Sequence, residues 1–143
     1  MSTIFNTDIT IQDDLEKVWN YFIDLENHGH KWMNGIPSLE KVTEDEVQEG
    51  TVYAFQSRGK QHKSTISEYV PKTKVTLTSV QGKFRADYTY TFVKHGDHTK
   101  VQLEADCEAE GMMKILSPLI KKAIKKSDLN QLERLKASYK NDQ

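Results

Sequence analysis

The sequence is poor in cysteine and in long apolar runs, and each shortage excludes a class of protein. A single cysteine, Cys107, excludes both a disulfide framework and a zinc site built from cysteines. No apolar run approaches the roughly 20 residues that a membrane-spanning helix needs. The polar residues at the start of the chain also differ from the basic and then apolar pattern of a secretion signal. We therefore expect a cytoplasmic protein without stable membrane insertion.

An excess of charge of one sign is also missing. Lysine and arginine number 20 against 21 aspartates and glutamates, which leaves a formal net charge of -1 at pH 7. Such a balance gives no general field to attract nucleic acid, so we expect no nucleic-acid partner. With 143 residues, of which 36% are hydrophobic, the chain is long enough for one core and too short for two ordinary ones. We expect a single domain over residues 1–143.

The most informative feature that is present is a strict alternation from Val101 to Glu110. Odd positions are apolar or small and even positions are polar or acidic, which predicts a strand with one buried and one wet face. The side chains of the buried face become smaller along the strand, in the order Leu103, Ala105, Cys107 and Ala109. The end of this strand therefore leaves room, as a ligand between sheet and helix would require.

A long amphipathic helix is predicted after Gly111. Apolar residues recur at helical spacing over 112–124 and resume over 132–139, with a kink expected near Ser117 and Pro118. The same helix carries a basic band formed by Lys114, Lys121, Lys122, Lys125 and Lys126. We interpret this band as a solvated outer face. Contact with anionic lipid heads is the alternative, if the protein exchanges lipid with a membrane.

The rest of the chain predicts a strand, then a helix followed by a short irregular or helical piece with Trp32 and Met33, and then a run of strands. The first strand spans 3–11, and the helix after it begins with a capping-box arrangement of Asp13 and Glu16 and ends near 27–29. Six strands come next, separated by turn-prone segments, at 39–44, 51–57, 63–70, 74–80, 84–94 and 99–110. Connections this short predict antiparallel neighbours. In the strand at 84–94, every second residue from Phe84 to Phe92 is expected to face inward.

Short motifs in a fixed order extend over nearly the whole chain. They are Leu15-Glu16-Lys17-Val18-Trp19, Trp32, Glu49-Gly50-Thr51, Glu68-Tyr69-Val70-Pro71, His98-Thr99-Lys100-Val101 and Leu132-Glu133-Arg134-Leu135-Lys136. In this order they resemble the START-like helix-grip superfamily called SRPBCC, with its polyketide cyclase/dehydrase-like and coenzyme Q-binding-protein-like members. The resemblance implies an α+β fold in which a seven-stranded curved antiparallel sheet wraps around the long C-terminal helix, with a cavity between them. It does not name the ligand, because one fold hosts many functions.

We expect this cavity to bind a small hydrophobic molecule such as a lipid, a quinone or a polyketide-like compound. Aromatic rings and methionines suit a flat apolar ligand. The expected lining residues are Trp32, Tyr88, Tyr90, Leu103, Cys107, Met112, Met113, Leu116 and Ile120. For each of them, ordinary core packing is the competing interpretation.

No pattern indicates catalysis, a metal or a cofactor. His28 and His30 have no third ligand nearby in the sequence, and we interpret them as solvated loop histidines. Glu68 is the carboxylate that could face inward, unless a β-bulge before Pro71 turns it out. Two alternatives therefore stay open. One is a cyclase-type enzyme that uses a tyrosine or Glu68 to polarise a polyketide-like substrate, and the other is an interaction module with a vestigial cavity.

Overall fold

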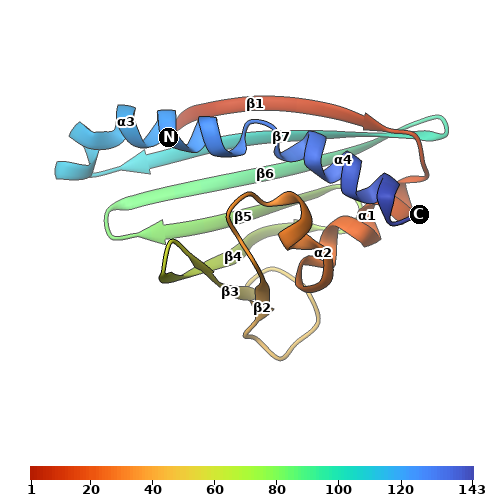
Figure 1. The fold of residues 1–143 in the computed structure, drawn as a ribbon, viewed down its shortest axis with the longest axis horizontal. Coiled ribbons are helices and arrows are strands. Elements are labelled where there is room, and N and C mark those ends of the chain that lie inside the picture. Colours follow the sequence, from red (N-terminus) through yellow and green to blue (C-terminus); the bar gives the residue numbers. More distant parts are fainter.

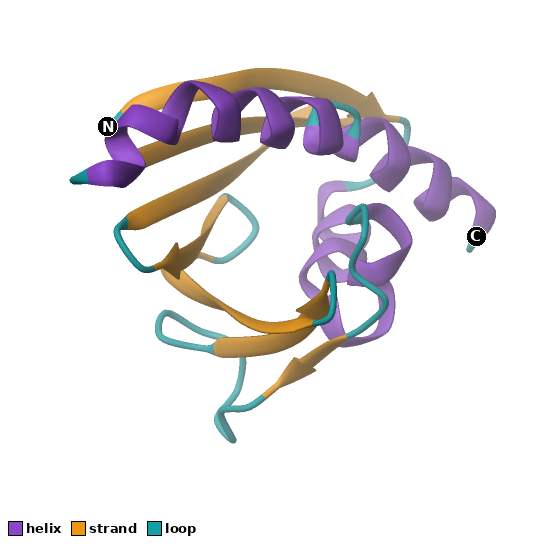
Figure 2. Cartoon of the chain, turned by 60° about the vertical axis from the view of Figure 1, so that its left-hand side comes forward, coloured by secondary structure: helices purple, strands orange, loops and turns teal.

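The chain folds into one curved sheet of seven strands with four helices against it (Figures 1 and 2). The computed structural model describes residues 1–143. The strands are β1 (Ser2–Ile11), β2 (Leu39–Lys41), β3 (Val52–Ser57), β4 (Lys60–Val70), β5 (Lys74–Gln81), β6 (Phe84–His95) and β7 (His98–Ala109). Their order is β1-β7-β6-β5-β4-β3-β2, and every neighbouring pair is antiparallel. The predicted antiparallel meander is confirmed, and the first strand closes it by pairing with the last.

Two short helices come after β1, where the sequence predicts one. They are α1 (Leu15–Ile23) and α2 (Leu25–Trp32), and the helix is broken at Asp24, whose backbone is not helical. The expected capping box is also wrong, because Asp14 is the N-cap of α1 and no side chain caps it. The carboxylate of Asp13 instead accepts the Asp14 N–H at 2.8 Å and the Tyr139 hydroxyl at 2.6 Å. Asp13 thus fixes the start of α1 to the end of the chain.

The C-terminal helix is divided into α3 (Met112–Asp128) and α4 (Gln131–Asn141). Gly111, with a φ of 60°, makes the turn from β7 into α3 in a conformation that favours glycine. Pro118 lies inside α3 without ending it, and the break between α3 and α4 falls at Leu129 and Asn130. A proline removes only one helical hydrogen-bond donor, and α3 continues past that loss. None of the four helices has the length and apolar character needed to cross a bilayer.

The main core lies between the sheet and the helices α1, α2 and α4. Its largest fully buried side chains include Phe22, Trp32, Tyr90 and Leu135. The ring centroid of Phe22 lies 5.0 Å from that of Trp32 and 4.8 Å from that of Tyr90, so α1, α2 and β6 meet in one aromatic cluster. The predicted inward face of β6 is confirmed, since Phe84, Ala86, Tyr90 and Phe92 are buried and Tyr88 is half-buried.

A β-bulge in β4 decides the direction of Glu68. Ile66 pairs with Leu77 and Glu68 with Thr76, so one extra residue, Ser67, stands between the two pairs and reverses the facing of the rest of the strand. Glu68 lies on the outer face, where its carboxylate accepts the Thr76 hydroxyl at 3.4 Å and pairs with the Lys74 ammonium at 3.1 Å. The possibility that Glu68 acts inside the fold is therefore wrong.

Candidate functional site

Helix α3 lies along β1 and β7 and is only thinly packed on them (Figure 1). None of its 17 residues is buried. Its apolar contacts with the sheet come from three half-buried side chains, Met113, Ile120 and Ile124, which pack against a small cluster separate from the main core. Helix α4 differs sharply, because it buries Gln131, Leu132, Leu135 and Tyr139. The two halves of the C-terminal helix are thus held to the sheet by very different amounts of apolar contact.

The sheet surface that faces α3 combines the small side chains of Ala86, Cys107 and Ala109 with the large ring of Phe84. Cross-strand pairing places Ala86 beside Cys107 and Phe84 beside Ala109, and Ala105 continues the same face. Ala105 and Cys107 are fully buried and Ala109 is half-buried, which confirms the predicted face of this strand. The thiol of Cys107 lies 3.8 Å from the Ser2 hydroxyl and is otherwise among apolar neighbours. The helix that covers these small side chains is therefore held by little apolar contact.

Two tyrosines of β6 reach the junction of α3 and α4. The hydroxyl of Tyr88 donates to the carboxylate of Asp128, and the hydroxyl of Tyr90 donates to the side-chain oxygen of Gln131. Burial raises the pKa of both tyrosines far above the usual value, so both hydroxyls stay protonated donors. Asp128 and Gln131 were not among the residues predicted from the sequence. The signal that could have identified them is the gap in the apolar stripe between Ile124 and Leu132.

Because Asp128 is largely buried, we expect the stability of the protein to depend on pH. The pKa of its carboxyl is raised, chiefly because burial disfavours the charged form. The folded protein then holds this proton more tightly than the unfolded chain does. The stability that this group contributes is therefore greatest below pH 3.8, and it falls as the pH rises through the folded-state pKa. Asp128→Asn removes the titration and keeps an oxygen that accepts from Tyr88. We expect the variant to be more stable than wild type at neutral pH.

Urea unfolding over a pH series measures this effect. The advantage of Asp128→Asn should shrink as pH falls through the folded-state pKa toward pH 3.8, because the folded wild-type protein takes up its proton in this range. Asp106→Asn, on the outward-facing side of β7, is the control and should change stability little. A difference between wild type and Asp128→Asn that does not vary with pH would contradict the assignment.

Two buried polar groups in the main core have no hydrogen-bond partner. They are the indole N–H of Trp32 and the hydroxyl of Tyr53. Burial raises the pKa of Tyr53 to about 12, so its hydroxyl stays protonated at neutral pH. Trp32 stands edge-on to Tyr90, with ring centroids 5.8 Å apart. Leaving such donors unpaired costs about 1–3 kcal/mol each, which a polar atom of a ligand would offset.

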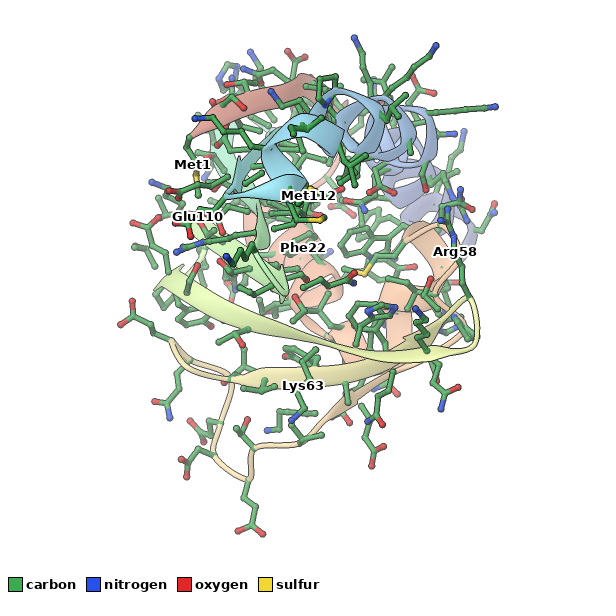
Figure 3. All side chains as sticks on the ribbon, turned by 90° about the vertical axis from the view of Figure 1, so that its left-hand side faces the viewer. Met1, Phe22, Arg58, Lys63, Glu110 and Met112 are labelled. Atoms are coloured by element: carbon green, nitrogen blue, oxygen red, sulfur yellow. The ribbon has the colours of Figure 1, made fainter.

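The predicted lining residues divide into three groups. Trp32, Tyr90, Leu103 and Cys107 are buried, and Tyr88, Met113 and Ile120 are half-buried. Met112 and Leu116, however, are 77% and 45% exposed, and placing them on the sheet-facing side of the helix was wrong. The contacting stripe runs through the predicted residues Met113 and Ile120 and through Ile124, and it leaves Met112 and Leu116 outside. Figure 3 looks onto this end of the molecule and labels Met112 at the start of α3.

The predicted residues also belong to two different apolar clusters. Trp32, Tyr90 and Leu103 lie in the main core, whereas Cys107, Met113 and Ile120 lie in the small cluster beneath α3. Tyr88 packs against both clusters and so joins them. The structure therefore brings one part of the predicted site together under α3 and places the other part in the main core next to it.

Two of the depressions on the molecular surface are lined by residues other than the predicted ones. One of about 370 Å³ lies on the strands β4 and β5 and is lined by Gln61, His62, Lys63, Val80 and Gln81. The other, of about 530 Å³, lies on the outer side of the α3–α4 junction and is lined by Lys122, Lys125, Lys126, Leu129, Asn130 and Glu133. The second depression has a strongly basic rim.

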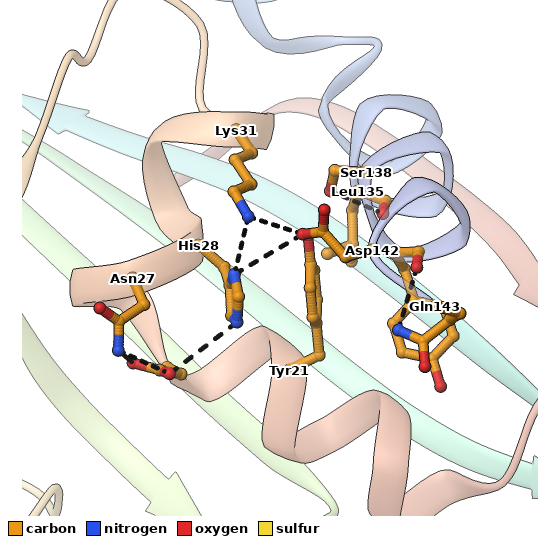
Figure 4. Close-up of polar contacts among 10 residues, drawn as sticks. Tyr21, Asn27, His28, Lys31, Leu135, Ser138, Asp142 and Gln143 are labelled. Carbon is orange, nitrogen blue, oxygen red and sulfur yellow. Dashed lines mark hydrogen bonds and ion pairs between the residues drawn. The ribbon is translucent and has the colours of Figure 1, made fainter.

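A polar cluster fastens the end of α4 to α1 and α2 (Figure 4). The carboxylate of Asp142 accepts the Tyr21 hydroxyl at 2.7 Å and the Lys31 ammonium at 2.6 Å, and these bonds lower its pKa. His28 stacks on Tyr21 with ring centroids 4.1 Å apart, so its interpretation as a solvated loop histidine was wrong. Its ring nitrogens lie 3.8 Å from Asp142 and 3.9 Å from Asp24. Helix α4 is therefore held by polar bonds as well as by the core.

Comparison with known proteins supports one fold. The model of a family described as polyketide cyclase / dehydrase and lipid transport matches residues 2–139. The protein TTHA0849 from Thermus thermophilus is 21% identical with a TM-score of 0.72, covering 96% of this chain and 97% of that one. The Zhui aromatase/cyclase from Streptomyces sp. R1128 is 10% identical with a TM-score of 0.75, covering 95% and 92%.

The di-domain ARO/CYC protein BexL of the BE-7585A biosynthetic pathway is also similar. It is 15% identical with a TM-score of 0.77, and the match covers 98% of this chain and 47% of BexL. A search of curated protein sequences finds no significant match. Identities this low indicate a shared helix-grip fold and do not carry an activity from one protein to another.

Proposed function

Because this chain belongs to the polyketide cyclase/dehydrase and lipid transport family, we propose that it binds a small hydrophobic molecule between α3 and the sheet. The ligand would be a lipid, a quinone or a polyketide-like compound. The observation that carries the proposal is the packing of α3, which covers a face of small side chains while burying none of its own. A helix held this loosely can be separated from the sheet at little cost to the core.

The apolar surfaces of this layer favour such a ligand. Met113, Ile120 and Ile124 are each only half-buried, so a ligand between them and Cys107 would remove further apolar surface from water. Each square ångström of apolar surface that is buried contributes about 25 cal/mol. Methionine adapts its shape to irregular ligands, which suits Met113 at the mouth of the layer.

Polar groups at the inner end favour a ligand that carries an oxygen atom. The Tyr88 and Asp128 pair lies where the small apolar cluster meets the main core, and Tyr90 lies beside it. The unpaired indole N–H of Trp32 stands next to Tyr90 and would donate to a carbonyl oxygen. Quinones, fatty acyl groups and polyketides all combine an apolar body with such an oxygen.

Filling the layer tests the proposal. Ala109 is half-buried at the end of β7 and packs in the cluster beneath α3. We expect Ala109→Trp to weaken saturable binding of the neutral dye Nile red about tenfold or more, because the indole occupies the ligand's place. If the layer has the room that the proposal requires, the free energy of unfolding should fall by less than the roughly 1–3 kcal/mol typical of overpacking. Fluorescence titration and urea unfolding measure the two quantities.

The matched control is Ala137→Trp, which adds the same side chain at an exposed position of α4. It should change neither dye binding nor stability. Unchanged Nile red affinity in Ala109→Trp, or a loss of stability beyond about 3 kcal/mol, would show that the layer is solid core. The proposal would then lose its physical basis.

A further inference from the structure

Helix α3 presents apolar side chains to solvent on the side turned away from the sheet. Met112, Ile115 and Leu119 are 77%, 76% and 70% exposed. At 3.6 residues per turn, Leu119 lies about 100° and Ile115 about 140° around the helix from Ile120, which contacts the sheet. Neighbouring exposed apolar side chains of this size mark an interaction site more often than a solvated face. The ligand layer beneath α3 does not use them.

The same side of α3 is strongly basic. Its five lysines and single aspartate give the helix a net charge of +4, although the chain as a whole carries -1. The aspartate, Asp128, is directed inward and bound to Tyr88, so the outer side is almost purely cationic. Lys122, Lys125 and Lys126 line the open depression of about 530 Å³ next to the exposed Leu129, with Asn130 and Glu133 completing its wall. Figure 3 shows nitrogen-tipped side chains extending from this side of the molecule.

We propose that α3 docks on the surface of an anionic lipid bilayer. Ile115 and Leu119 would enter the boundary between headgroups and acyl chains, and the lysines of the depression would contact lipid phosphates. An amphipathic helix with lysines beside its apolar face lies in the interface plane without crossing the bilayer. This arrangement agrees with the finding that no helix has a membrane-spanning apolar segment.

The positive charge of α3 favours an anionic bilayer over a second copy of the chain as the partner of this face. A second copy of the chain would bring two helices of net charge +4 together, and their repulsion disfavours a symmetric contact. An anionic bilayer instead attracts basic residues near its surface, and each lysine strengthens binding about fivefold. The inference does not depend on ligand uptake, because none of these side chains lies in the layer beneath α3.

Vesicle binding by the full chain tests the inference. We expect co-sedimentation with vesicles of phosphatidylcholine mixed with phosphatidylglycerol, and much weaker binding to phosphatidylcholine alone. Binding should be lost in about 1 M salt, where the Debye length falls to about 3 Å. The double variants Lys122→Glu/Lys126→Glu and Ile115→Ser/Leu119→Ser should each weaken binding about tenfold or more. Lys60→Glu/Lys94→Glu, at exposed positions far along the sheet, makes the same charge change and should keep binding.

A Leu119→Trp variant reports where the helix lies. Trp19 and Trp32 are buried, so a blue shift on adding mixed vesicles, and quenching by brominated acyl chains, would come from the new indole. Absence of both effects would overturn the proposal, as would equal binding to both kinds of vesicle. If Lys60→Glu/Lys94→Glu loses as much vesicle binding as Lys122→Glu/Lys126→Glu, the net charge of the protein explains the binding, and α3 is not the docking surface. Concentration-dependent self-association without vesicles would instead assign the face to a second copy.

The test separates this inference from the proposed function. Lys122→Glu/Lys126→Glu should retain Nile red binding, because the depression lies outside the ligand layer. Ala109→Trp should retain vesicle binding, because Ala109 is on β7 under the helix. If the wild-type protein binds Nile red but not the mixed vesicles, the docking surface alone is overturned. If it binds the mixed vesicles but not Nile red, the ligand site alone is overturned.

Discussion

Replacing Phe22 with alanine is expected to lower the free energy of unfolding by about 3–5 kcal/mol. Phe22 is completely buried in α1, and its ring packs on Trp32 of α2 and on Tyr90 and Phe92 of β6. Removing the ring leaves a cavity that three rigid aromatic neighbours cannot easily fill. Urea unfolding followed by tryptophan fluorescence measures the loss, with two buried tryptophans as reporters.

Leu119→Ala is the matched control for Phe22→Ala. Leu119 is a large apolar side chain that is 70% exposed, so its truncation should change the free energy of unfolding by no more than about 0.5 kcal/mol. A loss below about 1 kcal/mol for Phe22→Ala would show that the aromatic cluster collapses around the missing ring. The core would then be more adaptable than its packing indicates.

Truncating Leu135 should cost about 2–5 kcal/mol and would separate the roles of the two C-terminal helices. Leu135 is buried in the main core and holds α4 against the sheet. Leu116→Ala, on α3, should cost less than about 1 kcal/mol because Leu116 is 45% exposed. Both values come from urea unfolding.

Lys136→Ala, next to Leu135 and exposed, controls for a change of helix propensity in α4. It should leave stability nearly unchanged, since alanine is at least as good a helix former as lysine. Similar losses for Leu116→Ala and Leu135→Ala would show that α3 is anchored as firmly as α4. The ligand layer beneath α3 could then open only with the whole fold.

Most of the sheet could be predicted because its strands carry signals that do not depend on distant residues. Alternation in 101–110 and 84–92 identified both the strands and their inner faces. The bounds of the helices were harder to predict from the sequence than those of the strands. The apolar stripe continues across Asp24, so periodicity alone predicted one helix where the backbone breaks into two.

The candidate site was predicted only in part, and the reason lies in the composition of α3. Apolar residues occupy so much of its circumference that Met112 and Met113 are equally good candidates for the sheet-facing side. Only the partners on β6 and β7 decide between them. Asp128 and Gln131 were missed because their importance arises from Tyr88 and Tyr90, which lie about 40 residues earlier in the chain.

The pairing of β1 with β7 has a consequence for how the chain folds during synthesis. Ile11 pairs with Thr99 and Ser2 with Cys107, so nearly the whole sequence must leave the ribosome before the first strand has a partner. At about 5–20 residues per second, that wait is roughly 5–20 s. During this time Phe5 and Ile11, buried in the finished fold, are exposed on an unpaired strand that is open to aggregation or to a chaperone. The first strand to be made is thus among the last to be placed.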